Sequence, residues 1–418
     1  MPLADGVNVA PMTDRYWMKT QTPPAWSAVF AMSLAAFALV ASEFLPVSLL
    51  TPIAADLQVS EGQAGQGIAV SGAFALITSL FIASIAARVD RKRLLLALTL
   101  LMIVSGTVVA LAPNYLTFMA GRALIGVAIG GFWSLSAATA MRLVPQDQVP
   151  RALALVNGGN ALATVVAAPL GSFLGAIIGW RAAFFCIVPV ALVALVWLVL
   201  RLPSMQTRTK QGSGNVLALM ARPPIALGML AVSTFFMGQF MLFTYLRPFL
   251  ESVTQVSVSM LSFMLLVIGL AGLLGTFLIG ALLRNGVFRT LVIIPLVMAV
   301  IAIALVGFGK SVLITTVLLA LWGLIATAAP VGWWTWLSRA LPEEAEAGGG
   351  LMVVIVQLAI AAGATVGGVL FDLSGYQATF ETSAAVLVVA AMLTLMAARA
   401  AVRASSGASN AADYGVVN

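Results

Sequence analysis

Two charged residues stand out because they interrupt long apolar segments. Glu43 lies in the segment Ala-Ser-Glu-Phe-Leu-Pro, which ends at Pro46, and Arg122 lies in another apolar run. A charge at bilayer depth costs about 2.5 to 3.5 kcal/mol on insertion scales, so such residues are rare and usually functional. The sequence holds no histidine, the usual proton carrier near neutral pH. We therefore expect Glu43 to bind and release protons beside Arg122; the alternative is a purely structural pairing with Arg122 or a backbone group.

Amide and aromatic side chains in other apolar segments could bind a neutral solute. Rings can stack on a flat solute and amides can bond to its edge, as proteins do with exposed nucleobases. Aromatic residues also pack against lipid and anchor helices at membrane interfaces, which is the alternative for each ring. The residues predicted to bind substrate are Trp133, Asn157, Asn160, Gln239, Phe240, Trp334 and Gln357.

Signatures of enzymes, metal sites and bound cofactors are missing from the sequence. It has no zinc-ligand spacing, no nucleophile elbow and no dinucleotide-binding fingerprint. The single cysteine, Cys186, excludes a disulfide within the chain. We expect no enzymatic step, no metal and no cofactor.

The composition indicates the elements that position these residues. Of 418 residues, 61% are hydrophobic and 8% are charged, and the mean hydropathy is +1.08. A helix needs about 20 apolar residues to cross the hydrocarbon core, and continuous apolar runs exclude the alternating pattern of barrel strands. The sequence predicts an all-α membrane protein with twelve spans, near 26–50, 64–87, 94–112, 117–141, 152–178, 182–202, 224–247, 258–283, 290–309, 312–336, 349–371 and 379–400.

The net charge of +7 falls mainly on one side of these spans. All but four of the 21 lysines and arginines lie in segments on the side of the two termini. This bias places both termini in the cytoplasm of a multi-pass inner-membrane protein, in contact with lipid, and needs no nucleic-acid partner. Asp372 and Glu381 lie at span ends, where we expect simple solvation. The four exceptional cations are Arg122, Arg181, Arg247 and Lys310.

A polar interruption between the sixth and seventh spans divides the chain into two sets of six. An offset of 196 to 197 residues aligns Arg88 with Arg284 and Gly126 with Gly323. Such parallel repeats are typical of transporters whose halves rock about a site at the bilayer midplane. The predicted units are an N-terminal cytoplasmic tail at 1–25, halves at 26–202 and 224–400, a central cytoplasmic loop at 203–223 and a C-terminal cytoplasmic tail at 401–418.

Small residues follow helical spacing in two spans. Gly126 shares a helical face with Arg122, and Gly171 and Gly175 belong to a series of small residues at every fourth position. This spacing lets helix backbones approach closely, so we expect these glycines to form helix-packing contacts.

These features resemble the Major Facilitator Superfamily, in its bacterial drug and sugar efflux branch, over nearly the whole chain. The loop after the second span is similar to the family's gating loop, although Asp90 stands where the family has glycine. Arg122 and Gly126 match a family motif whose arginine is implicated in proton coupling. Pro169 and Gly171 keep part of the antiporter motif, which implies a packing role. The gating-loop residues implied by the resemblance are Arg88, Asp90, Arg91 and Lys92.

Within that branch, several stretches resemble exporters of purine ribonucleosides. They include Phe243-Thr-Tyr-Leu-Arg-Pro and Pro330-Val-Gly-Trp-Trp-Thr-Trp. The resemblance implies export of inosine and guanosine in exchange for protons by a protein that is expected to be a monomer. A sugar or multidrug exporter on the same fold is the alternative, because a fold does not fix its substrate. A further alternative is a membrane sensor that transports no solute.

Overall fold

The computed structural model describes residues 25–205, 219–284, 286–341 and 344–414, and within these ranges it contains helices and no strand. We call α1 to α6 the first helix group. Its members are α1 (Trp26–Leu57), α2 (Glu61–Ala86), α3 (Arg91–Ala110), α4 (Tyr115–Leu143), the short 3-10 helix η1 (Gln146–Gln148), α5 (Val149–Phe185) and α6 (Ile187–Arg201). The second helix group comprises α8 (Pro223–Phe243), α9 (Leu246–Ser252), α10 (Val258–Arg284), α11 (Val287–Phe308), α12 (Val312–Ala326), α13 (Ala329–Ala340) and α14 (Ala345–Tyr414).

The described residues include 10 helical runs long and apolar enough to cross a membrane. Two of these runs, Gln146–Arg201 and Gly348–Arg403, have 56 residues each. At 1.5 Å per residue such a run would extend about 84 Å, far beyond the roughly 30 Å hydrocarbon core. Each contains a glycine with a positive φ, Gly179 at 83° and Gly375 at 78°, where the chain turns back. The described chain therefore makes twelve crossings, which confirms the predicted all-α fold.

Two predicted spans, 224–247 and 312–336, are each divided into two helices. The first breaks after Phe243 and continues as α9, and the second breaks at Thr327 and Ala328 before α13. Pro248 and Pro330 explain both breaks, because proline has no N–H to donate to the carbonyl four residues earlier. The sequence predicted both spans, but not these breaks within them.

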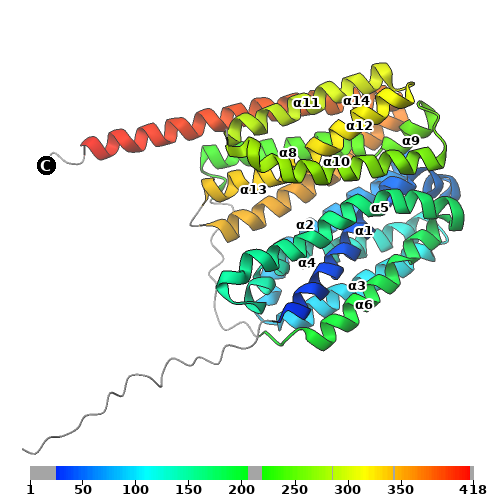
Figure 1. Ribbon diagram of the computed structural model, residues 1–418, viewed down its shortest axis with the longest axis horizontal. Helices are drawn as coiled ribbons and strands as arrows, with labels where there is room; N and C mark the ends of the chain where they lie inside the picture. The colour runs from blue at the N-terminus through cyan, green and yellow to red at the C-terminus, as the bar shows by residue number, and fades with distance from the viewer. Residues whose placement is uncertain (1–24, 206–218, 285, 342–343, 415–418) are drawn as a thin grey trace, which may run out of the picture.

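The helix ends meet at two opposite faces of the molecule. We call the face where residues 201–205 leave α6 the linker end, and there the N–H of Ala25 donates to the carbonyl of Leu143 at 2.8 Å. The opposite face, the far end, contains the turns at 58–60, 111–114, 253–257 and 309–311 and the kink at Gly375. The start of α1 and the end of α14 lie toward the linker end, and the two helix groups lie side by side (Figure 1).

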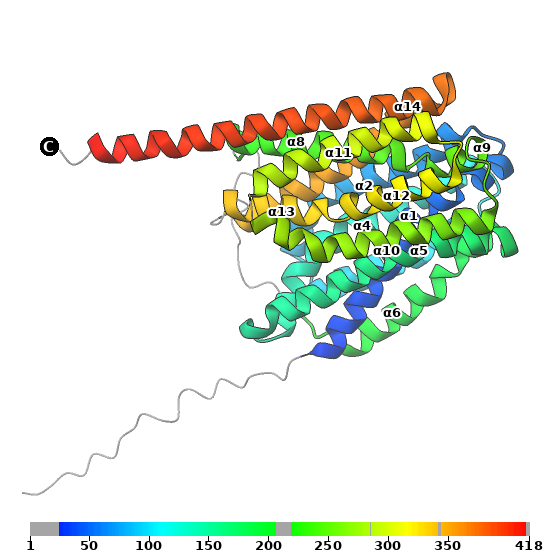
Figure 2. The ribbon, with the colours of Figure 1, turned by 45° about the horizontal axis from the view of Figure 1, so that its top comes forward.

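The buried apolar residues form three clusters that follow the two helix groups closely. One cluster runs from Leu219 to Ala390 and takes in a few residues of the first group, among them Val47. The other two belong to the first group, apart from Tyr245. The groups touch mainly through α2 with α14 and α5 with α10, and the second pair is adjacent in Figure 2.

Small residues bring helices together within and between the groups. A Cβ placed on Gly126 would lie 2.2 Å from the Ser71 carbonyl oxygen of α2. A Cβ on Gly171 would lie 2.7 Å from the Ser48 hydroxyl of α1, and one on Gly175 would lie 2.3 Å from a Leu49 methyl. Pro169 is buried in α5. Four residues before Pro169, Val165 packs against Gly269 of α10. A larger side chain at Gly126 or Gly269 would meet backbone atoms of the neighbouring helix, whereas at Gly171 and Gly175 it would meet side-chain atoms.

Replacing Gly126 with alanine tests this contact. A methyl group there meets the backbone of α2, which cannot yield by changing a rotamer, so we expect Gly126→Ala to destabilise the protein by roughly 1 to 3 kcal/mol. The measurement is the melting midpoint of the purified protein in detergent. Gly158→Ala is the matched control, since nothing lies within 4 Å of a Cβ on Gly158. A midpoint for Gly126→Ala equal to that of the control would contradict the packing account.

Candidate functional site

Glu43 lies near the middle of α1, roughly 26 Å along a helix of about 48 Å. Its side chain is buried, with 8% of its surface exposed. The Gln357 side chain of α14 lies beside the Glu43 carboxyl group, and Arg122 is close enough to act on that group electrostatically. A carboxyl group from one helix group therefore meets an amide from the other at the middle of the molecule.

Arg122 is fully buried, at 0% exposure, and its guanidinium is held by four acceptors. Nη1 donates to the Ser42 carbonyl at 2.9 Å and Nη2 to the Glu43 carbonyl at 3.2 Å. The remaining two acceptors are the Gly67 carbonyl at 3.0 Å and the Ser71 hydroxyl at 3.1 Å, both on α2. Arg122 thus binds the backbone beside Glu43, and the described ion pairs do not include a Glu43–Arg122 pair.

Proline explains why an arginine is needed at this depth. Pro46 has no N–H to donate to the Ser42 carbonyl, which would otherwise accept its helical hydrogen bond. Inside a membrane an unsatisfied backbone group costs several kcal/mol, so it must find another donor. Arg122 supplies that donor, and its positive charge comes to lie next to the Glu43 side chain as a result.

Two further contacts join the helix groups. The Phe44 ring of α1 stacks on the Phe240 ring of α8, with centroids 5.9 Å apart and an interplanar angle of 21°. The Thr365 hydroxyl of α14 donates to the Gln66 side-chain oxygen of α2 at 3.1 Å. We call the surface along which the two helix groups meet the seam. Together with Gln357, these residues give the seam both aromatic faces and amide groups.

The remaining predicted substrate residues are more dispersed. Trp133 is half-buried in α4, and Trp334 of α13 is 47% exposed. Asn157 is exposed and its amide donates to the Leu153 carbonyl of its own helix at 2.9 Å, while Asn160 is half-buried. Gln239 of α8 is half-buried, and its side-chain oxygen has no partner. The structure places Phe240 against Phe44 and Gln357 beside Glu43, and a substrate-binding role for all seven residues stays a prediction.

The loop between α2 and α3 is organised around Asp90. One carboxylate oxygen accepts from the backbone N–H groups of Lys92 at 2.8 Å and Arg93 at 3.3 Å, which caps α3. The other accepts from the Ser204 hydroxyl at 2.6 Å and the Met205 N–H at 2.8 Å. Partial burial raises the pKa of Asp90, but these four hydrogen bonds outweigh it and the net pKa lies below the ordinary value.

The basic residues of this loop differ in their surroundings. Arg88 is exposed, whereas the Arg91 side chain is buried and its backbone N–H donates to the Met205 carbonyl. The Lys92 ammonium donates to the Val199 carbonyl near the end of α6 at 2.9 Å. The described contacts tie the loop to the segment that leads out of α6, and a gating role for its residues stays a prediction.

The far end contains cross-group bonds that the sequence did not reveal. The Asp372 carboxylate of α14 accepts from the Ser60 hydroxyl at 2.5 Å and from the Gly62 N–H at 3.0 Å, at the start of α2. Asp372 is exposed, as expected at a span end, and these hydrogen bonds add a contact with α2 that was not predicted. Arg247 of α9 is 5% exposed and donates to the Ser48 carbonyl of α1. Among described residues, the hydrogen bonds between the groups lie toward the far end.

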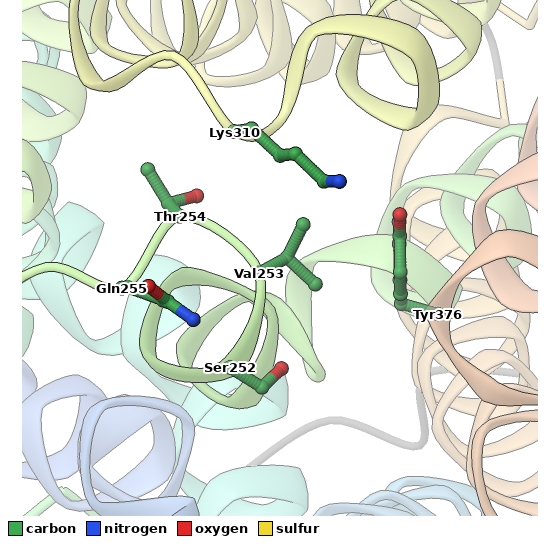
Figure 3. A pocket seen from close by; sticks show the side chains of 6 residues that line it. All are labelled: Ser252, Val253, Thr254, Gln255, Lys310 and Tyr376. Atoms are coloured by element: carbon green, nitrogen blue, oxygen red, sulfur yellow. The ribbon is translucent and has the colours of Figure 1, made fainter.

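A separate pocket of about 440 Å³ opens among the far-end turns of the second group. Lys310 and Tyr376 extend into the same space from different segments (Figure 3). Ser252, Thr254 and Gln255 line the opposite side, next to α9. None of the predicted substrate residues lines this pocket.

Comparison with known proteins settles the family. The sequence model of the Major Facilitator Superfamily matches residues 32–364. The chain belongs to the Major Facilitator Superfamily. It is a multi-pass membrane transporter of that type, which confirms the family expected from the gating loop and from Arg122.

Curated relatives cover most of the chain and differ in name. The transcription regulatory protein OpdE of Pseudomonas aeruginosa is 64% identical over 379 residues, which are 90% of this chain and 94% of that protein. The purine ribonucleoside efflux pump NepI of Salmonella paratyphi B is 39% identical over 370 residues, 88% of this chain and 93% of the pump. The Shigella sonnei pump of the same name is 39% identical over 372 residues, covering 89% and 94%.

Solved structures share the fold at low sequence identity. A bacterial homologue of the human lysosomal transporter Spinster, inward-facing and unoccupied, matches with a TM-score of 0.71 and 16% identity over 91% of this chain and 98% of that one. The human organic anion transporter MFSD10 matches with a TM-score of 0.62 and 19% identity, over 89% and 100%. At these identities the likeness supports the fold alone.

Replacing Asp90 tests the loop geometry through its pH dependence. The folded-state pKa lies below the unfolded value of about 3.9, so charged Asp90 adds stability that is present above that value and is lost as the pH falls through the folded pKa. We expect Asp90→Asn to lower stability at pH 7 by about 1 kcal/mol, and the difference from wild type to shrink below roughly pH 4. Melting midpoints over a pH series measure this.

Asp147→Asn in exposed η1 is the matched control for that series and is expected to leave the midpoint unchanged. A gap between wild type and Asp90→Asn that widens on acidification would show that the hydrogen bonds to the charged form are not what stabilises the loop.

Proposed function

We propose that this protein exports purine ribonucleosides such as inosine and guanosine across the inner membrane in exchange for protons. The observation that carries the proposal is the cluster of Glu43, Gln357, Phe44 and Phe240 on the seam between the two helix groups. It combines a titratable group with rings and an amide at mid-membrane depth. Transporters of repeated architecture bind their solutes and coupling ions at such a position.

The orientation of the protein follows from its charge. The linker end contains Arg88, Arg91 and Arg93, and the positive-inside rule assigns it to the cytoplasm. The segments at 1–25, 203–223 and 401–418 are then cytoplasmic, and 26–202 and 224–400 are the two moving halves. Residues 1–24 of the first tail and 206–218 of the central loop lie outside the described residues. A single chain contains the whole seam, so we propose a monomer surrounded by lipid.

Proton coupling in this proposal depends on which face can reach Glu43. With cross-group bonds at the far end, water and solute reach the seam from the linker end, where Glu43 releases its proton and a nucleoside can load. Separation of the far end then exposes Glu43 to the periplasm, where it takes up a proton as the solute leaves. A proton moving inward gains about 2.3 kcal/mol per 100 mV and about 1.4 kcal/mol per pH unit, enough to sustain a substantial solute gradient.

The seam also fits the chemistry of a purine base. A purine presents a flat π face to a phenyl ring and hydrogen-bond donors and acceptors along its edge to a carboxamide. Phe240 and Gln357 supply these groups, and Gln239 holds an unpartnered oxygen on the same helix as Phe240. The pumps that share 39% identity with this chain are named for purine ribonucleosides, which supports this substrate over a sugar or a drug.

A second candidate is a membrane sensor that regulates transcription without transporting solute. The observation that favours it is the name of the 64% identical relative, a transcription regulatory protein. Sensor and exporter differ in one measurable property, which is net solute flux.

Inside-out membrane vesicles distinguish these candidates. Their lumen corresponds to the periplasm, so an acid lumen should drive uptake of labelled inosine and guanosine in vesicles that contain the protein. Drug or sugar uptake without nucleoside uptake would assign the chain to the alternative exporters, and the absence of any flux would favour the sensor.

Glu43→Gln separates coupling from binding. The amide cannot exchange a proton, so we expect pH-driven inosine accumulation to be lost while exchange of labelled for unlabelled inosine across the membrane continues. Glu381→Gln is the control, because it makes the same substitution at a carboxylate that is exposed and not buried. Accumulation by Glu43→Gln at the wild-type level would remove Glu43 from the coupling role.

Phe240→Ala tests the ring as a surface for the base. Loss of one base-stacking contact is worth about 1 to 3 kcal/mol, so we expect KM for inosine to rise by about tenfold. Phe240→Tyr should keep a near-normal KM, and Phe277→Ala, which removes a ring that is 76% exposed, serves as the control. Initial uptake rates over a concentration series give these values; equal KM values for Phe240→Ala and Phe277→Ala would exclude the stacking role.

A further inference from the structure

The first helix contains a second proline with the same consequence as Pro46. Pro52 has no N–H to donate to the Ser48 carbonyl, four residues earlier in α1. Ser48 is buried at 0% exposure, so water does not take the place of that donor. The Nη1 group of Arg247 donates to this carbonyl from α9, in the other helix group. Both carbonyls that prolines release in α1 are therefore bound by buried arginines.

Arg247 differs from Arg122 in the group to which it belongs. Arg122 and Ser42 both lie in the first helix group and keep their bond whichever way the groups rock. Arg247 and Ser48 lie in different groups, so their bond can exist only while the far end is closed. Opening that end breaks the bond and leaves the Ser48 carbonyl without its donor.

The position of Arg247 is fixed on its own side of the seam. Glu251, one turn later on α9, accepts from Nε of Arg247 at 2.8 Å and forms an ion pair with it. Phe249, two residues after Arg247, is fully buried. Its ring packs against the Phe380 ring at a centroid distance of 4.9 Å and against the Tyr376 ring at 5.2 Å. The α9 segment is thus attached to the core of the second group, and the guanidinium reaches from it to α1.

We propose that Arg247 is a positioning residue for transport that keeps the far end closed by satisfying the Ser48 carbonyl that Pro52 leaves without a helical donor. The proposal rests on the transport function proposed above and adds a specific closing contact to it. The bond acts through α1, the helix that also contains Glu43. Closure of the far end and exposure of Glu43 toward the linker end are then properties of one helix.

A labelling experiment tests the bond without requiring any substrate. Val47 is 1% exposed within the cluster that otherwise belongs mainly to the second group, so Val47→Cys in a Cys186→Ala background reports opening of the far end. A membrane-impermeant maleimide is applied to the outside of intact cells. We expect Arg247→Met to raise the labelling rate by about tenfold, as loss of one hydrogen bond from a charged donor implies. Arg247→Lys, which keeps a charged donor, should label more slowly than Arg247→Met.

The combination with Pro52→Ala makes the test specific. Alanine at 52 restores a backbone N–H for the Ser48 carbonyl, so in that background Arg247→Met should no longer raise the labelling rate. In the Pro46→Ala background the effect of Arg247→Met should persist, because Ser42 does not use Arg247. Arg181→Met is a further control, since Arg181 pairs with Asp56 inside the first group at the same end.

Three results would overturn the proposal. One is an unchanged labelling rate in Arg247→Met at wild-type abundance in the membrane. Another is an equal increase in the labelling rate with and without Pro52→Ala. That result would show that Arg247 acts through its ion pair with Glu251 and not through the Ser48 carbonyl. The third is an equal increase in Arg181→Met. Because labelling needs no nucleoside, a failure of purine transport would leave these outcomes readable.

Discussion

A backbone carbonyl in the hydrocarbon region needs a donor, and α1 contains two whose own helix cannot provide one. Pro46 and Pro52 remove the N–H groups that would bond to Ser42 and Ser48. The structure satisfies the first carbonyl with Arg122, and this explains why a cation lies buried at the middle of the protein. The positive charge of Arg122 then interacts electrostatically with the carboxyl group of Glu43. The arrangement of charged groups at mid-membrane thus follows from the covalent structure of proline.

The same constraint connects the site to the movement of the two groups. α1 contacts α4 through Arg122, α9 through Arg247 and α8 through the Phe44 ring. A change in the position of α1 therefore alters the surroundings of Glu43, the aromatic stack and the closure of the far end together. At that end Asp372 accepts hydrogen bonds at the start of α2, where the positive end of a helix dipole favours an anion. The seam is a set of contacts that a rocking motion must exchange.

Much of this architecture could be predicted from the sequence. Twelve apolar runs fixed the number of crossings, because length and hydropathy determine where a chain can span a bilayer. Glu43 and Arg122 stood out because a charge in such a run is rare, and the structure buries both side chains. The breaks at Pro248 and Pro330 could have been predicted from the same rule that applies to Pro46, but hydropathy alone does not register them.

The contacts between the helix groups could not be predicted in the same way. Arg247 lies at the end of a predicted span, where a cation is expected to be solvated at the membrane interface. Pro52 did indicate that a carbonyl on α1 needed a donor, but not which residue would supply it. Asp372 reads as a solvated carboxylate because nothing in its own segment shows that the start of α2 lies beside it. Asn157, in contrast, satisfies its amide within its own helix, which hydropathy cannot distinguish from a group facing a solute. Pairings of distant segments depend on the three-dimensional arrangement and not on local composition.

Exchange of outward-moving purine nucleoside for inward-moving protons through this seam can be measured directly. Proteoliposomes of the purified protein are loaded with inosine and a pH-sensitive dye and are then diluted into inosine-free buffer with no initial pH gradient. We expect inosine leaving the lumen to draw protons in, so that the lumen acidifies at a rate that depends on the protein. Efflux of inosine without acidification, or with alkalinisation, would contradict the exchange of nucleoside for protons.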